Sequence, residues 1–386
     1  MTFDELVTVA GEHRASDIHL RAGHAPLVRI GGSLIRWDHV APMTADYLDA
    51  LSLRLLSPAH QERLQTKLEV DVAWQAPGVG RVRASVFRQR GTIAVSMRLI
   101  PSVVPSLEEL GLPPAVIDLA KETRGLVLVT GVTGSGKSTT LAALVDLINR
   151  TRPEHILTIE DPIEFVHRDA MAVVTQREIG FDTPSYASGL RSALRQDPDI
   201  ILIGEMRDPE TIETALTAAE TGHLVFSTLH TLDAPETINR IVSAFPPHQQ
   251  QQLRHQLASV LRASISQRLL PRADGGGRAL AAEVLVATPY IKDCVEDPDK
   301  TSLIRDAIVN GVSQYGMQSF DQAILKLVHE GTVTIEEAMR WVTNVEEFKM
   351  RLRGITTGSA ASAPAATANR EPVGAGSRPD LHRFGR

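Results

Sequence analysis

The stretch LVLVTGVTGSGKSTTLAALVDLI, residues 126–148, decides the fold. It joins an apolar, strand-like run to a helical pattern through GVTGSGKS (131–138), which fits the spacing G-x-x-x-x-G-K-S. In such a loop, consecutive N–H groups and the N-terminus of the next helix converge on an anion. We therefore predict a nucleotide phosphate site in which Lys137 reaches the β- and γ-phosphates and Ser138 ligates Mg²⁺. The predicted ATP-binding residues are Gly131, Thr133, Gly134, Ser135, Gly136, Lys137, Ser138 and Thr139.

Apolar strand patterns alternate with amphipathic helical patterns on both sides of this loop. The strand patterns that follow it are HILTIE (155–160), VVTQRE (173–178), IILIGE (200–205) and LVFSTLH (224–230). This alternation is typical of an α/β fold with a mostly parallel sheet and helices on both faces.

The chain divides into five stretches by composition and pattern. Residues 1–100 contain short β-like runs, glycine turns and one helix-like stretch around 44–66, and 101–123 form a proline-punctuated linker. The α/β pattern covers 124–290, and 291–353 is helical. Residues 354–386 are rich in Ala, Ser, Thr, Gly and Pro, so they bury too little apolar surface to order themselves and should be disordered.

Composition narrows the function classes. No apolar run reaches the ~18 residues of a membrane span, and the N-terminus MTFDELVTVAGEH is acidic where a signal peptide would be basic. We therefore expect a cytoplasmic protein. Cys294 is the single cysteine, which excludes internal disulfides and multi-cysteine zinc sites. A net charge of −6 argues against a general nucleic-acid-binding protein.

Two acidic groups end strand patterns. The apolar run IILIG places Glu205 at a strand end. Gly204 stands where such strands usually carry an aspartate before the glutamate, so Glu205 is the only acid at this point. We expect it to act as a general base or through Mg²⁺-bound water. EDPIE (160–164) ends the strand HILTI. Such carboxylates are also typical of helix caps and solvated turns. Convergence of several strand ends on one crevice of an open α/β sheet favours catalysis.

Two histidines flank the last strand pattern, in AETGHLVFSTLHT (219–231). His230 follows the strand on the phosphate side, where it can orient the γ-phosphate, whereas His223 precedes the strand. Strand spacing of ~3.3 Å per residue separates them by about 20 Å or more, so one metal cannot bind both. Geometry alone favours a structural role for His223.

Four stretches together resemble the motifs of type II/IV secretion ATPases. GVTGSGKSTT, TIEDPIEFVH, ALRQDPDIILIGEMRD and TAAETGHLVFSTLHT are similar to the Walker A, Asp, Walker B and His boxes, in order. ASDIHL (15–20) and YGMQSFDQA (315–323) resemble the PilT-type retraction ATPases of type IV pili in particular. The resemblance implies a PAS-like N-terminal α+β domain, a RecA-like P-loop ATPase core, C-terminal helices, and a homohexamer that binds ATP and Mg²⁺ between subunits.

The same resemblance assigns roles to individual side chains. Glu164 and Glu205 become the important acids and, with Ser138, the residues near Mg²⁺. His223 and His230 both belong to the functional His box. Three arginines on strand-like segments, Arg83, Arg90 and Arg98, match positions that approach the nucleotide when the N-terminal domain closes. The alternative, that these arginines face solvent, stays open.

The implied function is pilus retraction and twitching motility, through peripheral contact with an inner-membrane platform protein like PilC and with a second retraction ATPase as a further partner. PYIKDCVED (289–297) replaces the A-I-R-N-L-I-R-E signature of these motors, so a PilU-like accessory role remains open. A single cysteine argues against the assembly branch, which carries a four-cysteine zinc insertion. A regulatory ATP-binding ring and a DNA translocase are more distant alternatives, and the acidic balance disfavours DNA.

The segment 289–297 raises one further question. Tyr290, Ile291 and Val295 form an apolar stripe at helical spacing. The stripe is either part of the region that couples hydrolysis to the platform protein or the core of a small helical domain.

Overall fold

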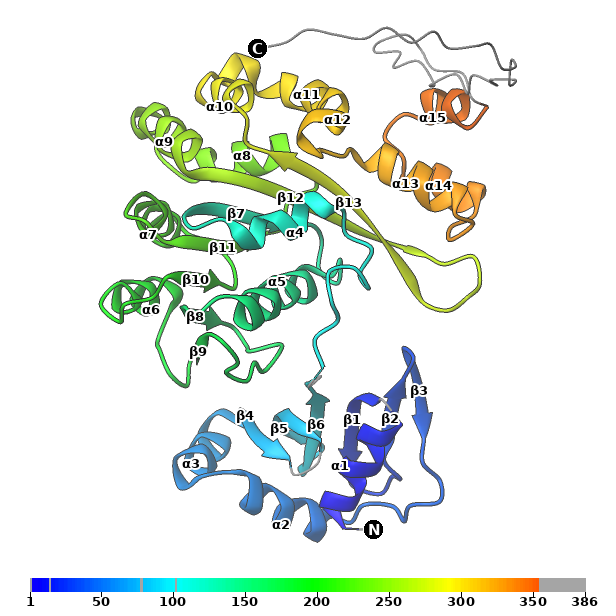
Figure 1. Cartoon of the computed structure of the whole chain (residues 1–386). Helices are drawn as coiled ribbons and strands as arrows, with labels where there is room; N and C mark the ends of the chain where they lie inside the picture. The colour runs from blue at the N-terminus through cyan, green and yellow to red at the C-terminus, as the bar shows by residue number, and fades with distance from the viewer. Residues whose placement is uncertain (1, 14, 77–78, 101–102, 354–386) are drawn as a thin grey trace, which may run out of the picture.

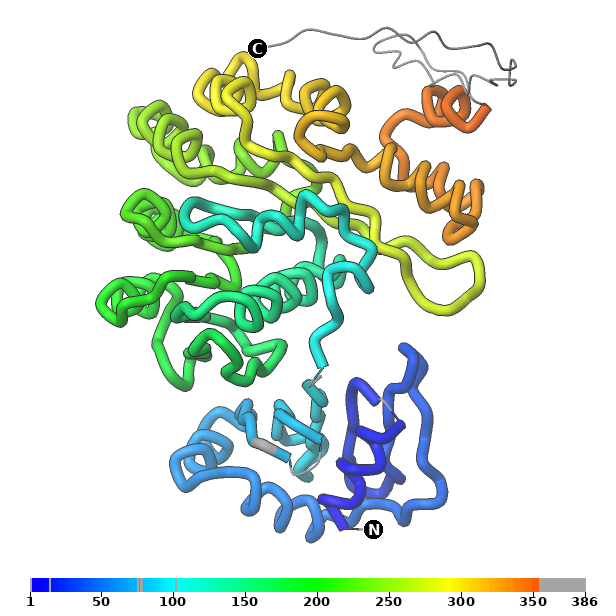
Figure 2. Tube along the Cα trace, viewed as in Figure 1, coloured from blue at the N-terminus to red at the C-terminus, as the bar shows by residue number. Residues whose placement is uncertain are grey.

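The computed structural model describes residues 2–13, 15–76, 79–100 and 103–353. Two sheets organise these residues, one between residues 15 and 99, in the N-terminal part of the chain, and one between residues 125 and 286 (Figure 1). The N-terminal domain and the C-terminal helices lie at opposite ends of the molecule, with the parallel sheet between them (Figure 2). The predicted disordered tail, 354–386, lies outside the described residues.

The N-terminal domain is a six-stranded antiparallel sheet in the order β3-β2-β1-β6-β5-β4, covered by helices. Every neighbouring pair is antiparallel, and inward-facing side chains such as Ile18, Val82 and Val95 form its core with Leu6 and Leu48 of the helices. Its elements are α1 (Phe3–Glu12), β1 (Ala15–Arg21), β2 (Leu27–Ile30), β3 (Ser33–Arg36), α2 (Ala45–Leu55), α3 (Pro58–Lys67), β4 (Glu69–Ala76), β5 (Gly80–Gln89) and β6 (Thr92–Leu99).

The helical stretch predicted around 44–66 is two helices. Ser57 caps α3, with its hydroxyl accepting a hydrogen bond from the N–H of His60, and Pro58 occupies the first turn. Proline disfavours a helical conformation at the residue before it, so the chain breaks between α2 and α3.

The second sheet has seven strands in the order β13-β12-β7-β11-β10-β8-β9. All neighbours are parallel except β12 and β13, which form an antiparallel hairpin. The strands are β7 (Gly125–Thr130), β8 (His155–Glu160), β9 (Val173–Glu178), β10 (Ile200–Ile203), β11 (Leu224–Leu229), β12 (Leu261–Pro271) and β13 (Arg278–Val286). The predicted α/β fold with a parallel sheet is confirmed.

Alternate side chains of the interior strand β7 enter two different cores. Leu126 and Leu128 pack in one apolar cluster, and Val127 and Val129 pack in another on the opposite face. Such a strand reads as a continuous apolar run because both of its faces are covered. Helices on the first face are α6 (Tyr186–Ala193), α7 (Pro209–Glu220), α8 (Ala234–Ser243) and α9 (Pro247–Val260); on the second are α4 (Pro114–Asp118), η1 (Leu119–Lys121) and α5 (Lys137–Thr151).

The C-terminal region is helical. Residues 291–308 continue the first apolar cluster, and residues 320–348 pack with β12 and β13 in a separate cluster. It contains α10 (Pro289–Glu296), η2 (Pro298–Leu303), α11 (Ile304–Asn310), α12 (Val312–Tyr315), α13 (Phe320–His329), α14 (Ile335–Trp341) and α15 (Val345–Leu352). Helix α10 runs across the predicted boundary at 290/291. Ile291 and Val295 are fully buried in the cluster, whereas Tyr290 is 51% exposed. Ile291 and Val295 of the apolar stripe are therefore core, and Tyr290 is not.

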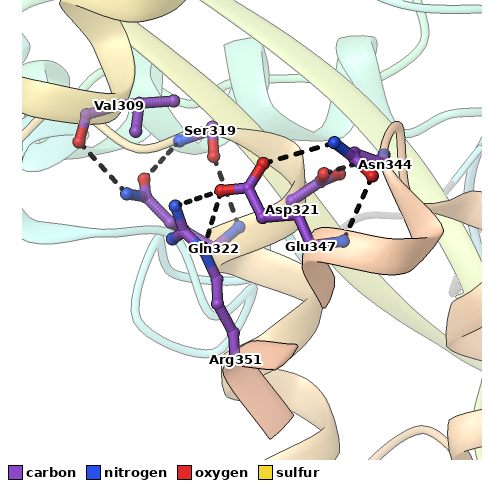
Figure 3. Close-up of polar contacts among 7 residues, drawn as sticks. All are labelled: Val309, Ser319, Asp321, Gln322, Asn344, Glu347 and Arg351. Atoms are coloured by element: carbon purple, nitrogen blue, oxygen red, sulfur yellow. Dashed lines mark hydrogen bonds and ion pairs between the residues drawn. The ribbon is translucent and has the colours of Figure 1, made fainter. Parts of the chain in front are cut away.

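A polar network joins the last helices to one another (Figure 3). The carboxylate of Asp321 accepts hydrogen bonds from the backbone N–H groups of Thr343 and Asn344, at 2.8 and 3.2 Å. Gln322 closes the capping box of α13 and donates to the carbonyl of Val309, 3.2 Å away. These bonds satisfy backbone groups at three helix ends, which fixes α11, α13 and α15 against each other. Within the described residues, no helix combines the length and apolarity needed to cross a membrane.

Candidate functional site

The glycine-rich loop lies between β7 and α5, as the sequence predicts. Gly131 has φ 138°, and a Cβ there would lie 2.5 Å from Ser135 Oγ and 2.6 Å from the carbonyl oxygen of Gln267. A side chain at this position therefore has no room. Gly136, at φ 94°, is the N-cap of α5, so the loop enters the helix through a left-handed residue that glycine adopts without strain.

Lys137 is folded back onto this loop. Its ammonium donates to the carbonyl oxygens of Gly131 at 2.8 Å and Val132 at 3.1 Å. Burial lowers the pKa of Lys137, and the negative charge of Glu205 opposes that shift. The ammonium is thus held beside the loop N–H groups, where a phosphate can replace the carbonyl oxygens as its partner.

A cavity of about 580 Å³ opens in front of the loop, at the carboxyl edge of the parallel strands. Its volume falls in the usual range for small-molecule sites, about 300–1,000 Å³. Six of the eight predicted phosphate-binding residues line it: Thr133, Gly134, Gly136, Lys137, Ser138 and Thr139. Ser135 points beneath the loop instead, and its buried hydroxyl has no hydrogen-bond partner among the described residues.

Glu205 faces this cavity from the end of β10. Its Oε1 atom lies 2.7 Å from Nε of Arg207 and 3.3 Å from Nε2 of His230. Burial raises the pKa of Glu205, but the hydrogen bond from Arg207 and the proximity of His230 outweigh it, so the pKa is lower than usual. The group is therefore a carboxylate at neutral pH, as a proton acceptor must be.

Gly204 explains why only one acid ends this strand. A Cβ at Gly204 would lie 2.8 Å from the hydroxyl of Tyr186 and 3.3 Å from the carbonyl oxygen of Ile159. The Gly204 N–H also donates to that carbonyl at 2.8 Å. Close packing of the strand end against β8 and α6 leaves no room for the aspartate that an Asp-Glu pair would place here.

The second acidic group, 160–164, also reaches the cavity. Glu160 and Glu164 both line it. Burial raises the pKa of Glu160, although its carboxylate accepts hydrogen bonds from Thr158 at 2.7 Å and Gln176 at 3.2 Å. The half-buried Glu164 donates its backbone N–H to Glu160 at 3.5 Å. The sequence analysis predicts a role for Glu164 but none for Glu160, although both belong to the acidic group that follows the same strand pattern.

The two histidines lie at opposite ends of β11. His230 follows Leu229, lines the cavity and contacts Glu205. His223 does not line the cavity: its Nδ1 atom lies 2.9 Å from the carbonyl oxygen of Ala218, near the end of α7. The chain itself thus gives His223 a structural contact, and its catalytic assignment stays a prediction.

Of the three predicted arginines, one reaches the cavity. Arg98, on β6, lines it, and its Nε donates to Asp17 at 3.1 Å. Arg83 pairs with Arg98 across β5 and β6, but its guanidinium lies 3.8 Å from Asp71. Arg90 lies in the turn between these strands, with φ 50°, and does not line the cavity.

Three further residues that line the cavity, Arg207, Tyr186 and Arg278, are not predicted from the sequence. Arg207 lies two residues after Glu205, so strand-end position was a usable signal. Tyr186 comes from α6, and Arg278 comes from the start of β13, where its guanidinium donates to the carbonyl of Gly134 at 3.3 Å. Neither has a neighbouring motif in the sequence. Only the folding of β13 beside the loop brings Arg278 there.

The described residues contain no group of three or more His, Cys, Asp or Glu side chains arranged to hold a metal by themselves. Mg²⁺ in nucleotide sites keeps several waters and binds one or two protein oxygens together with substrate phosphates. The hydroxyl of Ser138 and the carboxylates of Glu164 and Glu205 line the same cavity and match this oxygen donor set.

Comparison with known proteins adds an independent line of evidence. Residues 2–276 match the family model described as type II/IV secretion system protein. A type IV pilus retraction ATPase, PilT, from Pseudomonas aeruginosa is 44% identical over 90% of this chain and 100% of its own length. The type IV pilus ATPase PilU of the same species is 35% identical over 92% of each chain.

Solved structures agree with these relatives. The crystal structure of the pilus retraction motor PilT with bound ADP superposes with a TM-score of 0.83, at 45% identity, covering 90% of this chain and 98% of that one. The ATPase DotB of Legionella pneumophila matches with a TM-score of 0.73 and 30% identity, covering 91% and 95%.

Proposed function

This chain belongs to the type II/IV secretion system protein family, in the PilT-type group of ATPases, and on that premise we propose that it is a motor whose ATP hydrolysis drives type IV pilus retraction. One observation carries the proposal within the molecule. The phosphate loop with Lys137 and the carboxylate of Glu205 with His230 face one cavity at the carboxyl edge of the sheet.

Nucleotide binding rests on the loop and its lysine. The loop N–H groups and the N-terminus of α5 bind the phosphates, because the unpaired N–H groups of the first helical turn point out of the N-terminal end towards an anion. The ammonium of Lys137 leaves the carbonyls of Gly131 and Val132 and takes phosphate oxygens as partners. The charged hydrogen bonds formed in this exchange are stronger than the neutral ones that it gives up.

Hydrolysis rests on Glu205. A water between this carboxylate and the γ-phosphate attacks phosphorus, Glu205 accepts the proton of the water, and ADP leaves as the β–γ bridging bond breaks. His230, 3.3 Å from Glu205, orients the carboxylate and contacts the γ-phosphate. Mg²⁺, when bound, neutralises charge on the phosphate oxygens, and Ser138 with Glu164 would hold it.

Arginine completes the charge balance of the cavity. Arg98 comes from the N-terminal domain and its side chain is 63% exposed, so it is accessible to a γ-phosphate when the domain closes. A guanidinium placed there neutralises charge that develops on phosphate oxygens. Arg83 and Arg90 contribute only after a rearrangement. We propose that the active form is a homohexamer with nucleotide between subunits.

The direction of work follows from the relatives. The chain is more similar to the PilT retraction ATPase than to PilU, which favours the principal motor over the accessory one despite the altered segment 289–297. The single cysteine disfavours the assembly branch. The ring would work at the cytoplasmic face of the inner membrane by peripheral contact with a PilC-like platform protein, with a second retraction ATPase as a further partner.

Deleting the gene tests this direction. A retraction motor predicts that surface pili accumulate and that twitching motility stops, as electron microscopy and a motility assay would show. Loss of pili would favour assembly instead. Pilus retraction that continues with reduced force or speed would favour the accessory role.

Purified protein tests the enzyme itself. ATP turnover should be measurable without DNA and should not rise when DNA is added. Stimulation by DNA would support a translocase, and nucleotide binding without turnover would support a regulatory ring.

A further inference from the structure

One buried ion pair joins the N-terminal domain to the parallel sheet. Nη2 of Arg81, on β5, lies 2.7 Å from Oε2 of Glu178, the last residue of β9. The Glu178 side chain is 3% exposed and that of Arg81 is 28% exposed. A carboxylate removed from water to this extent needs its partner, because an unpaired buried charge is strongly destabilising. A second contact, an edge-on packing of His60 against Phe181, lies close by in the chain.

The same carboxylate oxygen holds the loop that carries Glu164. Oε2 of Glu178 accepts a hydrogen bond from the backbone N–H of Ile163 at 3.3 Å. Ile163 directly precedes Glu164, which lines the nucleotide cavity. One oxygen atom therefore connects the N-terminal domain with the acidic loop of the site.

Gln176, two residues earlier on β9, holds the rest of this loop. Its amide donates to Glu160 at 3.2 Å and to the carbonyl of Phe165 at 2.9 Å. It also accepts the N–H of His167 at 2.9 Å. Residues i and i+2 of a strand share one face. The side chains of Gln176 and Glu178 therefore both form hydrogen bonds to the segment 160–167 from the same face of β9. Glu178 is the one of the two that the N-terminal domain contacts.

Arg81 and Arg98 lie on paired neighbouring strands. The N–H of Ile100 donates to the carbonyl of Arg81 at 2.9 Å, and Arg83 is the register partner of Arg98. The two arginines are thus carried by one antiparallel pair, β5 and β6. When Arg81 holds Glu178, Arg98 lies at the cavity.

We propose that Arg81 is a positioning residue for ATP hydrolysis, which acts through Glu178 to set the loop of Glu164 when the N-terminal domain is docked. This inference rests on the proposed function. Undocking the domain breaks the ion pair and leaves Glu178 as an unpaired buried charge, which is unfavourable. The carboxylate then turns towards water and releases the N–H of Ile163. The acidic loop and Arg98 then leave their places in one event, so domain position switches hydrolysis while the phosphate loop still binds nucleotide.

Steady-state ATP turnover of the full-length chain tests the proposal with four variants. Arg81→Ala should lower kcat by about 10- to 100-fold, as small misplacements of a catalytic group do, with little change in the KM for ATP. Glu178→Ala should have a similar effect. The double variant should be no slower than Glu178→Ala, because Arg81 acts only through that carboxylate. Arg81→Lys, which keeps the charge, should recover part of the turnover.

Arg36→Ala is the matched control. Arg36 makes an exposed ion pair with Asp38 within the same domain, so its loss should change neither kcat nor KM. Additive losses in the double variant would show that Arg81 acts independently of Glu178 and would overturn the proposal. Wild-type kcat in Arg81→Ala would overturn it as well. Absence of turnover in the unmodified chain would instead overturn the proposed function.

Hydrogen exchange provides a readout that does not depend on activity. The amide of Ile163 should exchange faster in Arg81→Ala than in the unmodified chain or Arg36→Ala, while the amides of β7 remain protected. Unchanged exchange at Ile163 would refute the link. If Arg81→Ala does not fold, Glu178→Ala and the double variant, which contain no unpaired carboxylate, still decide the question through their relative kcat.

Discussion

The two ends of β11 carry the two histidines of one sequence motif and do different work. At the carboxyl end, His230 contacts Glu205 and lines the nucleotide cavity. At the amino end, His223 binds the carbonyl of Ala218, and its own carbonyl accepts the N–H of Gly125 at 3.0 Å. The first position collects side chains from neighbouring strand ends, and the second joins a helix end to the sheet. Position along a parallel strand, rather than residue type, decides which histidine lines the cavity.

The largest expected effect is a loss of turnover on changing Glu205, at the carboxyl edge of the sheet beside His230. Glu205→Gln should lower kcat by about 10²- to 10⁴-fold, the usual contribution of a general base, because the amide keeps the shape and cannot accept the proton. ADP binding, measured by calorimetry, should persist. Since the pKa of Glu205 is lower than usual, protonation of Glu205 should not reduce turnover as the pH falls from 8 to 6. Turnover by the Gln variant near the unmodified rate would remove Glu205 from this role.

Lys137→Ala comes next and acts on binding. A hydrogen bond to a charged group contributes about 1.5–3 kcal/mol, so ADP affinity should fall by about 10- to 100-fold. Calorimetric titration with ADP measures this directly, and turnover at fixed ATP should fall with it. Unaltered affinity would mean that the ammonium stays with the carbonyls of Gly131 and Val132 in the bound state.

A paired substitution tests the comparison itself. His230→Ala should lower kcat by about 10- to 100-fold through the misplaced carboxylate. His223→Ala should affect turnover less and should lower stability by about 1 kcal/mol, the net value of one hydrogen bond. Kinetics and thermal melting of both variants would show this. A larger kcat loss in His223→Ala would contradict the structural assignment and indicate contact with a neighbouring subunit.

The smallest expected effect on turnover comes from Glu283, which contacts the segment after the carboxyl end of β11 and mainly affects stability. Glu283 is buried and accepts the N–H of Ala234 at 2.9 Å, at the start of α8. Burial raises the pKa of Glu283 to about 7. The folded chain therefore binds a proton that the unfolded chain releases between pH 4.5 and 7, so stability declines as pH rises through this window.

Glu283→Gln should remove this pH dependence. The amide can still accept the Ala234 N–H, and it avoids ionisation, which costs about 3 kcal/mol at pH 8. The variant should melt at a higher temperature than the unmodified chain at pH 8, and the two should converge near pH 5. Parallel melting curves at both pH values would show that Glu283 does not titrate in this range.

Sequence patterns place side chains most directly where one short segment contains the whole arrangement. The strand, loop and helix of 126–148 are contiguous, so spacing alone places Lys137 and Ser138 at the cavity. The strand containing 224–229 likewise places His230 at the carboxyl edge of the sheet, where it lines the cavity. The division into domains stays a prediction, and the structure adds that the boundary at 290/291 falls within α10.

The sequence leaves the choice open where alternatives are equal in pattern. Three arginines alternate with apolar residues on β-like segments, and nothing local distinguishes Arg98 from Arg83 or Arg90. Only the position of β6 beside the cavity does so. Ile291 and Val295 pose the same problem, because an apolar helical stripe has one periodicity whether it meets a partner or its own core.

The sequence by itself determined the phosphate loop, the acid at the end of β10 and the parallel order of apolar strands, because each depends on neighbours within a few residues and on strand or helix periodicity. Only the tertiary structure decided the partners of these groups. Arg81 meets Glu178 across 97 residues and Arg278 meets Gly134 across 144. Such contacts depend on how two sheets and a hairpin pack, and the free energy that selects them is shared among all the buried side chains of both cores.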